Sequence, residues 1–370
     1  MIATPRIPFM SLVPGEDAVD VRAAIDRVIE RGWFILGPEV VSFEEEFAAA
    51  SGAAHAVGVG NGTDAIALIL RALGIGAGDE VITTPLSAAY SALAIMMAGA
   101  RPVFVDVDGT RLTIDPERIA AAIGPRTRAI LPVHLYGQPA DMAAIEAIAN
   151  AKQLAIVEDC CQAHLATAAG RPVGTVGAAG AFSFYPTKNL GALGDGGAIV
   201  TGDRALAARL KRLRNGGQTD RYHHQEPGIN SRLDDLQAAV LRARLPRLAG
   251  WTDRRRALAA RYRDRLAGSA VDVPPERDPG HVYHLFVVRH RERTALQAHL
   301  AARGIETLIH YPVPIPRQPA LAALDPADCP VAARACNDIL SLPCHPALRD
   351  EDVDEVAAAV HAFEARTVAP

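Results

Sequence analysis

The sequence predicts an α/β fold in which a large, mostly parallel sheet domain is followed by a smaller α+β domain. From about residue 54 to residue 201, short apolar runs alternate with helical patterns, as in sheets that carry helices on both faces. Further strand-like and helix-like segments follow a long basic helix in the last third of the chain. With 370 residues, 49% of them hydrophobic, the chain is long enough for both cores. We therefore expect a large domain over residues 1–250 and a small domain over residues 251–370.

Two helical patterns, over residues 17–30 and 38–50, precede the alternation, and we expect them to pack between domains or subunits. Within the alternation, short apolar runs bounded by Gly, Asn or Asp are typical of buried strands. Strands are expected at 55–59, 154–157, 181–184 and 196–200, and later helices at 203–214 and 231–249.

Pro246, Gly250 and Trp251 predict the junction to the small domain, because proline and glycine interrupt helices. The helix that follows, WTDRRRALAARYRDRLAG, carries arginines that we expect on a solvated face. A strand over VYHLFVVRH, a helix closed by Gly304 and a further strand from ETLIHYP complete the expected α+β domain.

Composition excludes several classes of protein. A net charge of −4 with a pI of about 6.3 gives no basic field, so nucleic acid is not an expected partner. No apolar run is long enough for a signal peptide or a membrane span, so we expect a cytoplasmic protein with no membrane partner. The 5 cysteines lack metal-ligand spacing, and we expect them reduced, with no metal site. Cys160 and Cys161 are interpreted as apolar filler, with a nucleophilic thiol as the alternative.

Lys188 lies in a turn between two of the buried runs, in the stretch FSFYPTKNLGALGDGGAIV. An amine that attacks a carbonyl must lose its proton near neutral pH, which requires a partly desolvated pocket. Most lysines are exposed, so a surface turn is the ordinary interpretation. Two neighbouring segments favour instead a lysine that holds an aldehyde cofactor through a Schiff base.

Asp159 follows the apolar run LAIV in the segment EDCCQAH, where the carboxyl end of a strand would place it at a ligand-binding edge of the sheet. A carboxylate at that edge can hold a protonated ring nitrogen, as pyridoxal phosphate requires. Gln162 could reach the ring hydroxyl or pack on the ring face. The alternative is that Asp159 only caps a following helix.

The segment GVGNGTDAIALIL leads from a strand through a glycine-rich turn, which includes Gly62, into an amphipathic helix that starts near Thr63. Backbone N–H groups at such a helix start bind phosphate. The segment also resembles a dinucleotide fingerprint with Glu80 as the ribose-binding acid, but Glu80 stands where the next strand is entered and not at its far end. Together with Lys188 and Asp159, the glycines therefore predict a pyridoxal phosphate enzyme.

A family resemblance extends nearly from end to end of the chain. It is carried by RGWFILGPEV, GNGTDAI, PVFVDVD, ILPVHLYGQPADM, VEDCCQAH, FSFYPTKNLGALGDGGAIVT, GINSRLDDLQAAVL, HYPVPIPRQPA and LSLPCHPAL. These segments resemble the DegT/StrS family of sugar-nucleotide aminotransferases, which are pyridoxal phosphate enzymes of fold type I. The resemblance implies the same fold, cofactor and class of reaction.

The resemblance also implies roles for individual residues. Lys188 would carry the cofactor, Asp159 would pair with the pyridine nitrogen and Gln162 would meet the ring hydroxyl. The phosphate group would be held by Gly62, Thr63 and Ser183. Asn230 is similar to a residue that completes the phosphate site of the neighbouring subunit, which implies a homodimer with shared active sites.

Two positions depart from the family pattern. Relatives carry an aromatic residue that stacks on the cofactor where this chain has Ala88, and we expect Tyr90 to cover the ring instead; the alternative is a tyrosine in the core. In the loop HYPVPIPRQPA, Pro316 and Arg317 replace the usual histidine and aliphatic residue. That loop faces the sugar nucleotide in relatives, so the departure concerns substrate preference.

The expected reaction is a two-step transamination, in which L-glutamate gives its amino group to the cofactor and a keto sugar linked to a nucleoside diphosphate then takes it. The overall charge supplies no positive field, so local residues must bind the diphosphate. Candidates for substrate contact are Arg221, Arg232, His310, Tyr311 and Arg317. The segments LYGQPADM and LIHYPVP resemble relatives that act on 3-keto sugars.

Other functions were weighed against this one. A 4-keto sugar is the alternative substrate. A dehydratase or epimerase of the same fold would lack the lysine or carry a redox-cluster motif, and a non-catalytic regulator would carry a basic DNA-binding extension. The sequence has the lysine and shows neither of the two additions.

Overall fold

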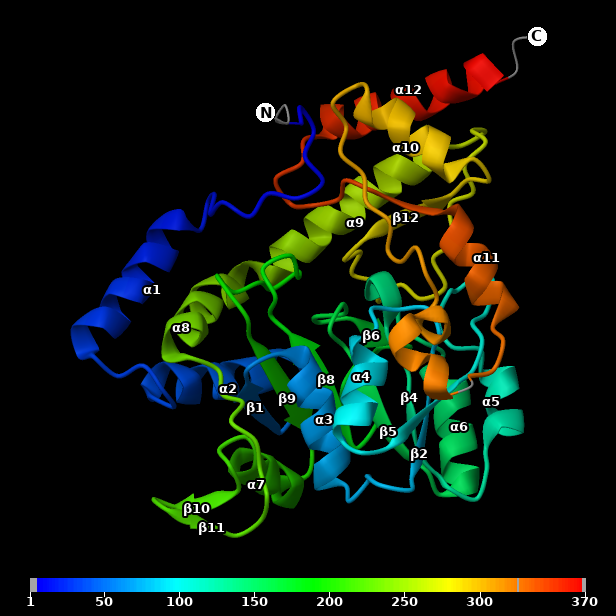
Figure 1. Cartoon of the computed structure of the whole chain (residues 1–370). Coiled ribbons are helices and arrows are strands. Elements are labelled where there is room, and N and C mark those ends of the chain that lie inside the picture. Colours follow the sequence, from blue (N-terminus) through cyan, green and yellow to red (C-terminus); the bar gives the residue numbers. More distant parts are fainter. Residues whose placement is uncertain (1–4, 325, 368–370) are drawn as a thin grey trace.

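The computed structural model describes residues 5–324 and 326–367. Its central element is a sheet of seven strands (Figure 1). The strand order is β1-β9-β8-β5-β4-β2-β3. These strands are β1 (His55–Val59), β2 (Glu80–Thr83), β3 (Arg101–Phe104), β4 (Thr127–Leu131), β5 (Ala155–Asp159), β8 (Ala179–Ser183) and β9 (Gly197–Thr201). Only β9 runs antiparallel to its neighbours, β1 and β8, while the other pairs in this sheet are parallel. The predicted mostly parallel sheet is confirmed.

Alternate side chains of the strands enter two separate cores, as the two-residue period of a strand requires. In β5, Val157 joins one core and Ile156 joins the other. The first core also takes residues of α3 (Gly62–Ala72), α4 (Tyr90–Met97) and α7 (Arg204–Leu213). The second takes residues of α2 (Pro38–Ala50), α5 (Pro116–Ala122), α6 (Met142–Lys152) and α8 (Asp235–Arg244). Both faces of the sheet are therefore covered by helices, which explains its nearly continuous apolar strands.

The two helices before the sheet form where the sequence predicts them. They are α1 (Ala18–Arg31) and α2. On its inner face α1 buries Ala24 and Val28 against Ala239 of α8. Its other face keeps Val19 and Ile29 exposed. An exposed apolar face on a helix of this kind indicates a further contact surface.

A third hydrophobic core belongs to the C-terminal part of the chain. Here β12 (Phe286–Arg289) pairs antiparallel with β13 (Ile339–Leu342). The surrounding helices are α9 (Leu248–Arg265), α10 (Arg293–Ala301) and α12 (Asp350–Thr367), while α11 (Pro330–Asp338) buries its apolar residues in the first core of the sheet. The core contains Tyr262 stacked on Phe286, with Leu258 and Val360 beside them. This is the α+β arrangement that the sequence predicts after the large sheet.

Three local expectations about this region hold only in part. The helix break falls at the 3-10 turn Leu245–Arg247, where Pro246 lacks an N–H, and α9 runs through Gly250 and Trp251. Three arginines of α9 lie at the surface, as expected, but pair with acids of α12, and Arg255 is buried. The segment 306–312 forms only a bridge from Leu308 to Ser341 instead of a strand.

Short hairpins complete the chain. One is formed by β6 (Thr167–Ala168) and β7 (Arg171–Pro172), and the other by β10 (Gln218–Asp220) and β11 (His223–His224). The β10–β11 hairpin lies at the periphery of the molecule beside α7 (Figure 1). Over the ranges given above, no helix combines the length and apolar character needed to cross a membrane.

Candidate active site

Lys188 lies in the turn between β8 and β9, where its backbone N–H donates to the Tyr185 carbonyl at 2.8 Å. The side chain is half-buried. Burial lowers the pKa of its amine from the usual 10.5, and Cys161 and Asp159 nearby offset part of this effect. A lowered pKa favours the neutral amine, which is the form that attacks a carbonyl. The partly desolvated pocket predicted for this lysine is present.

Asp159 ends β5 and is 5% exposed. Its Oδ2 accepts a hydrogen bond from Ser91 Oγ at 2.7 Å, and its Oδ1 accepts one from the Cys161 N–H at 3.1 Å. No helix follows β5 directly, so the helix-cap alternative is wrong. Among the described residues, no cation forms an ion pair with this carboxylate. A buried carboxylate without an ion-pair partner is suited to accept a hydrogen bond from a cationic ring N–H. The residues present therefore fit a protonated pyridine ring at this place.

Gln162 is held by hydrogen bonds at both ends of its amide. Its Oε1 accepts from the Tyr136 N–H at 2.7 Å, and its Nε2 donates to the Tyr311 hydroxyl at 3.0 Å. The Tyr136 hydroxyl in turn donates to the His310 carbonyl. The amide therefore connects the end of β5 to the loop around residue 311. Contact with a ring hydroxyl stays a prediction.

The start of α3 is packed closely against the ends of β5 and β8. The Asn61 side chain caps the helix by accepting from the Asp64 N–H at 2.8 Å. A Cβ added at Gly62 would lie 2.6 Å from Cys161 Sγ and 3.0 Å from Ser183 Cβ, so only glycine fits. The free N–H groups of a helix start attract phosphate. The geometry thus fits the phosphate site predicted at Gly62, Thr63 and Ser183.

Ser231 connects the segment before α8 to the start of α3 through hydrogen bonds. Its Oγ accepts from the Gly60 N–H at 2.9 Å and donates to Asp64 Oδ2 at 2.6 Å. The preceding residue, Asn230, is exposed. Asn230 therefore lies near the start of α3, at the surface of its own chain.

The adjacent thiols are neutral side chains. All five cysteines are free, and Cys160 is fully buried in the second core of the sheet. Burial is the main reason that the pKa of both Cys160 and Cys161 is raised well above its usual value. Since a nucleophilic cysteine needs a lowered pKa, the interpretation as apolar filler is favoured over a reactive thiol.

Behind the site, Glu158 is a buried anchor whose structural role the sequence does not predict. It accepts from the N–H groups of Gly174 at 2.8 Å and Val176 at 2.9 Å, and from His134 Nε2 at 3.1 Å. His134, Glu158 and Cys160 lie close enough to hold a metal ion, but both ring nitrogens of His134 are used, since Nδ1 accepts from the Ala140 N–H. The group therefore holds the strand that carries Asp159.

Tyr90 is the first residue of α4 and is 62% exposed, so the alternative of a core tyrosine is wrong. The buried side of this short helix is formed by Ala92, Ala94 and Ile95. Tyr90 is close enough to Tyr311 to influence the pKa of that hydroxyl, which burial raises. The residue is placed where it could cover a ring, and its stacking stays a prediction.

The candidate substrate residues fall into two groups. Tyr311 contacts Gln162, and the adjacent His310 is half-buried with Nδ1 2.9 Å from Ser341 Oγ. Burial and Lys188 lower the pKa of His310 to about 4, so it is neutral at pH 7. The Ile315 N–H donates to the Pro85 carbonyl at 2.8 Å, which sets this loop against the segment that leads to Tyr90.

The three arginine candidates lie apart from these contacts. Arg317 is exposed and pairs with Asp328. Arg221 is exposed at the β10–β11 hairpin, with its guanidinium over the Tyr222 ring. Arg232 donates to Asn215 Oδ1 at 2.9 Å. The chain itself does not bring Arg221 and Arg232 into contact with the residues around Lys188.

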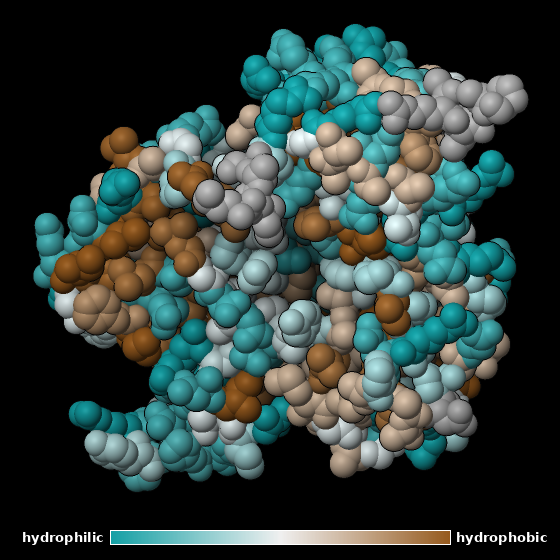
Figure 2. Space-filling view, turned by 45° about the horizontal axis from the view of Figure 1, so that its top comes forward, coloured by the Kyte–Doolittle hydropathy of each residue, from teal (hydrophilic) through white to brown (hydrophobic). Residues whose placement is uncertain are grey.

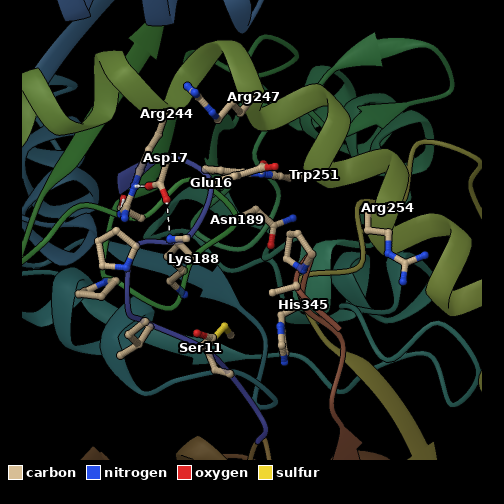
Figure 3. Close-up of a pocket in the computed structure, with 18 of the residues that line it drawn as sticks. Ser11, Glu16, Asp17, Lys188, Asn189, Arg244, Arg247, Trp251, Arg254 and His345 are labelled. Carbon is tan, nitrogen blue, oxygen red and sulfur yellow. Dashed lines mark hydrogen bonds and ion pairs between the residues drawn. The ribbon is translucent and has the colours of Figure 1, made fainter. Parts of the chain in front are cut away.

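A cavity of about 680 Å³ opens beside Lys188. Figure 3 shows Lys188, Asn189, Trp251 and His345 arranged around it, with the N-terminal segment 10–17 forming another wall. A cavity of this size accommodates a small metabolite. Of the residues that line the cavity, the sequence predicts a ligand contact for Lys188 alone.

The comparisons with known proteins agree with this geometry. Residues 16–361 match the DegT/DnrJ/EryC1/StrS aminotransferase family. The chain is 49% identical over 371 residues to dTDP-3-amino-3,4,6-trideoxy-alpha-D-glucose transaminase from Streptomyces venezuelae, covering 98% of this chain and 97% of the relative. It is 48% identical over 362 residues to the erythromycin biosynthesis sensory transduction protein EryC1 from Saccharopolyspora erythraea, covering 96% and 99%. The crystal structure of S. venezuelae DesV superposes with a TM-score of 0.94 at 49% identity, covering 97% of this chain and 99% of DesV.

The fold and the site define an aminotransferase of fold type I whose cofactor is pyridoxal phosphate. The chain belongs to the DegT/DnrJ/EryC1/StrS aminotransferase family.

Proposed function

We propose that the enzyme moves an amino group from L-glutamate to a 3-keto sugar linked to a nucleoside diphosphate. The observation that carries the proposal is the half-buried Lys188 amine, with its lowered pKa, near the buried and unpaired carboxylate of Asp159. The position of the keto group is supported by the S. venezuelae relative, whose name places the amino group at C3 of a dTDP sugar.

Each residue of the site has a task in this proposal. Pyridoxal phosphate, when bound, supplies an electron sink for the carbanion that forms at the α-carbon of the donor. Asp159 keeps the ring nitrogen protonated, and the first turn of α3 at Gly62 and Thr63 binds the phosphate with Ser183. Lys188 holds the cofactor, and its freed amine carries a proton from the α-carbon. Gln162 meets the ring hydroxyl and Tyr90 covers the ring.

We further propose that the enzyme is a homodimer in which Asn230 of each chain completes the phosphate site of the other. The apolar residues exposed around α1 and α2 support a contact between two copies. They are Val19, Ile29, Trp33, Phe34, Ile35 and Val41. Figure 2 shows a broad hydrophobic area on this side of the molecule. Patches of this kind typically mark protein interfaces.

In such a dimer, Arg221 and Arg232 of one chain would contact the diphosphate bound in the site of the other chain. His310, Tyr311 and Arg317 would contact the sugar. The five free cysteines support a reducing compartment, so we place the enzyme in the cytoplasm.

The absorption spectrum of the purified protein tests the proposed function. We expect a yellow protein whose visible band disappears on addition of L-glutamate and returns on addition of a dTDP-linked 3-keto sugar. Lys188→Ala should lack the covalent adduct that borohydride traps, because no other amine replaces it. A trapped adduct with full turnover in Lys188→Ala would remove the lysine from its role. Preference for the 4-keto isomer would overturn the substrate assignment, and a protein without cofactor chemistry would point to a regulator.

A further inference from the structure

Arg255 of α9 is a buried cation without an acidic partner. Arg255 is 3% exposed, and no carboxylate among the described residues lies within ion-pair distance of its guanidinium. Its three hydrogen bonds all leave from Nη1, to the carbonyls of Tyr283 at 3.2 Å, His284 at 3.3 Å and Cys344. The buried Nε has no partner in the described part of the chain. A buried charge without a counter-charge costs free energy, so a bound anion would stabilise this guanidinium.

Arg255 is also one of the residues that line the cavity beside Lys188. Three other arginines of the cavity wall already have acidic partners. Arg244 pairs with Asp17, Arg247 with Asp20 and Arg254 with Asp350. Arg255 therefore differs from these arginines in having no such partner, which identifies it as the residue to attract an anionic ligand.

Arg255 and Lys188 are electrostatic neighbours. After burial, which is the main cause, both cations lower the pKa of His164, to about 3, and of His284. The two histidines are consequently neutral at pH 7 and add no charge. Among the described residues that line the cavity, Lys188 and Arg255 are therefore the lysine and arginine side chains that have no acidic partner.

We propose that Arg255 binds a carboxylate of the amino donor in this cavity. The inference rests on the proposed function, because it requires L-glutamate to approach Lys188, the amine that it displaces. One uncompensated guanidinium matches one carboxylate, which would accept from Nη2, because Nη1 is already used by three carbonyls and Nε is buried. The arginines proposed for the diphosphate, Arg221, Arg232 and Arg317, do not line the cavity. Arg255 is thus a specificity residue for the donor.

A purely structural role would account for part of this arrangement. The three carbonyl contacts hold α9 to the segments around Tyr283 and Cys344, but they leave Nε without a partner. The two interpretations differ in which half of the reaction depends on Arg255. A donor-binding residue affects only the step with L-glutamate, whereas a structural residue affects both steps equally.

The test follows the two half-reactions separately by absorbance in the holoenzyme. For Arg255→Met, the L-glutamate concentration at half-maximal rate should rise about 10-fold to 100-fold, since a hydrogen bond to a charged group is lost. The half-reaction of the aminated enzyme with the keto sugar should stay at the wild-type rate. Arg255→Lys should recover part of the loss. Arg261→Met is the matched control, because Arg261 lies on the same helix but pairs with Asp354 at the surface.

Glutarate, a dicarboxylate without an amine, tests binding without turnover. Calorimetric titration should detect glutarate binding to the wild type and to Arg261→Met, and not to Arg255→Met. Equal losses in both half-reactions, or a loss confined to the keto sugar step, would overturn the inference. If Arg255→Met does not fold, Arg255→Lys carries the same comparison, because its amine can still donate to the carbonyls. If the wild type binds glutarate but L-glutamate never changes its spectrum, the proposed function fails while the anion site stands.

Discussion

At the scale of single residues, the environment of Asp159 decides what its charge can do. Its Oδ2 accepts from Ser91 Oγ and its Oδ1 from the Cys161 N–H. An asparagine could keep both contacts, because its amide oxygen can accept from the Cys161 N–H while its NH2 group donates to the Ser91 hydroxyl, which is also an acceptor. What an amide cannot supply is the negative charge that keeps a ring nitrogen protonated. The carboxylate is thus important for its charge more than for its hydrogen bonds.

We therefore expect Asp159→Asn to retain pyridoxal phosphate, because the phosphate is bound elsewhere, and to lose transamination by orders of magnitude. Single-turnover absorbance with L-glutamate measures the loss. Ser91→Ala is the control, because it removes one hydrogen bond to the same carboxylate and leaves its charge. That variant should lose only about 1 kcal/mol, or roughly fivefold in rate. Turnover near the wild-type rate in Asp159→Asn would remove the residue from this role.

Sequence alone predicts the candidate site residues that stand in strong local patterns. Lys188 and Asp159 follow buried strand-like runs, and both positions hold in the structure. Ser91, by contrast, lies 68 positions from Asp159 in a helix with no distinctive pattern. Its contact arises because β2 and β5 are near each other in the sheet, which no local pattern records. The sequence does not distinguish Arg255 from the other arginines of its basic helix for the same reason, since no local pattern records its contacts.

At the scale of elements, the start of α3 shows how closely three segments approach one another at the proposed phosphate site. The backbone at Gly62 lies against Cys161 after β5 and against Ser183 at the end of β8. Any side chain at position 62 would separate the helix start from the strands. Local helix propensity would favour alanine over glycine here, so packing and not propensity explains this residue.

We expect Gly62→Ala to reduce the free energy of unfolding by about 1–3 kcal/mol, as overpacking does, and to weaken pyridoxal phosphate binding. Urea unfolding and cofactor titration measure the two effects. Adding Cys161→Ala should recover part of both losses, because it removes the Sγ that lies 2.6 Å from the new Cβ. Gly202→Ala is the matched control, since a Cβ at Gly202 meets nothing within 4 Å. Unchanged cofactor affinity in Gly62→Ala would mean that the helix start does not bind the phosphate.

Elements were predicted well where a single run of residues determines them and poorly where distant residues do. The expected strand 55–59 coincides with β1, because a short apolar run of this kind is buried whichever elements pack against it. The expected solvated face of α9 did not include its ion pairs, because Arg261 pairs with Asp354, 93 positions away, and this pairing depends on how α12 packs. Likewise, Leu308 forms only a bridge to Ser341 because that segment turns into the loop beside Gln162.

At the scale of the whole molecule, one chain does not bring all the proposed site residues together. Lys188, Asp159 and Gln162 surround the ends of β5 and β8, whereas Asn230 and Arg221 lie at the surface of the segment between α7 and α8. Because Asn230 is exposed beside the phosphate region, it can reach a second chain that packs there. The exposed apolar residues around α1 and α2 offer such a chain a contact surface.

A mixture of two inactive variants tests this shared site. Lys188→Ala and Asn230→Ala should each be nearly inactive, because each damages both sites of its own dimer. In a mixed dimer, one site combines the Lys188 of one chain with the Asn230 of the other and is therefore intact. An equal mixture that exchanges subunits freely should recover about a quarter of the wild-type activity, since half of the dimers are mixed and each has one intact site of two.

The control for this experiment is an equal mixture of Lys188→Ala and Asp159→Asn. Both of these residues serve the site of their own chain, so every site in their mixed dimer is damaged and no activity should return. Recovery in the control would mean that the lysine and the aspartate come from different chains. Absence of recovery in the first mixture, with mixed dimers demonstrated by mass spectrometry, would confine Asn230 to its own chain. A fully active monomer would refute the shared site altogether, because it would show that one chain contains every group the reaction needs.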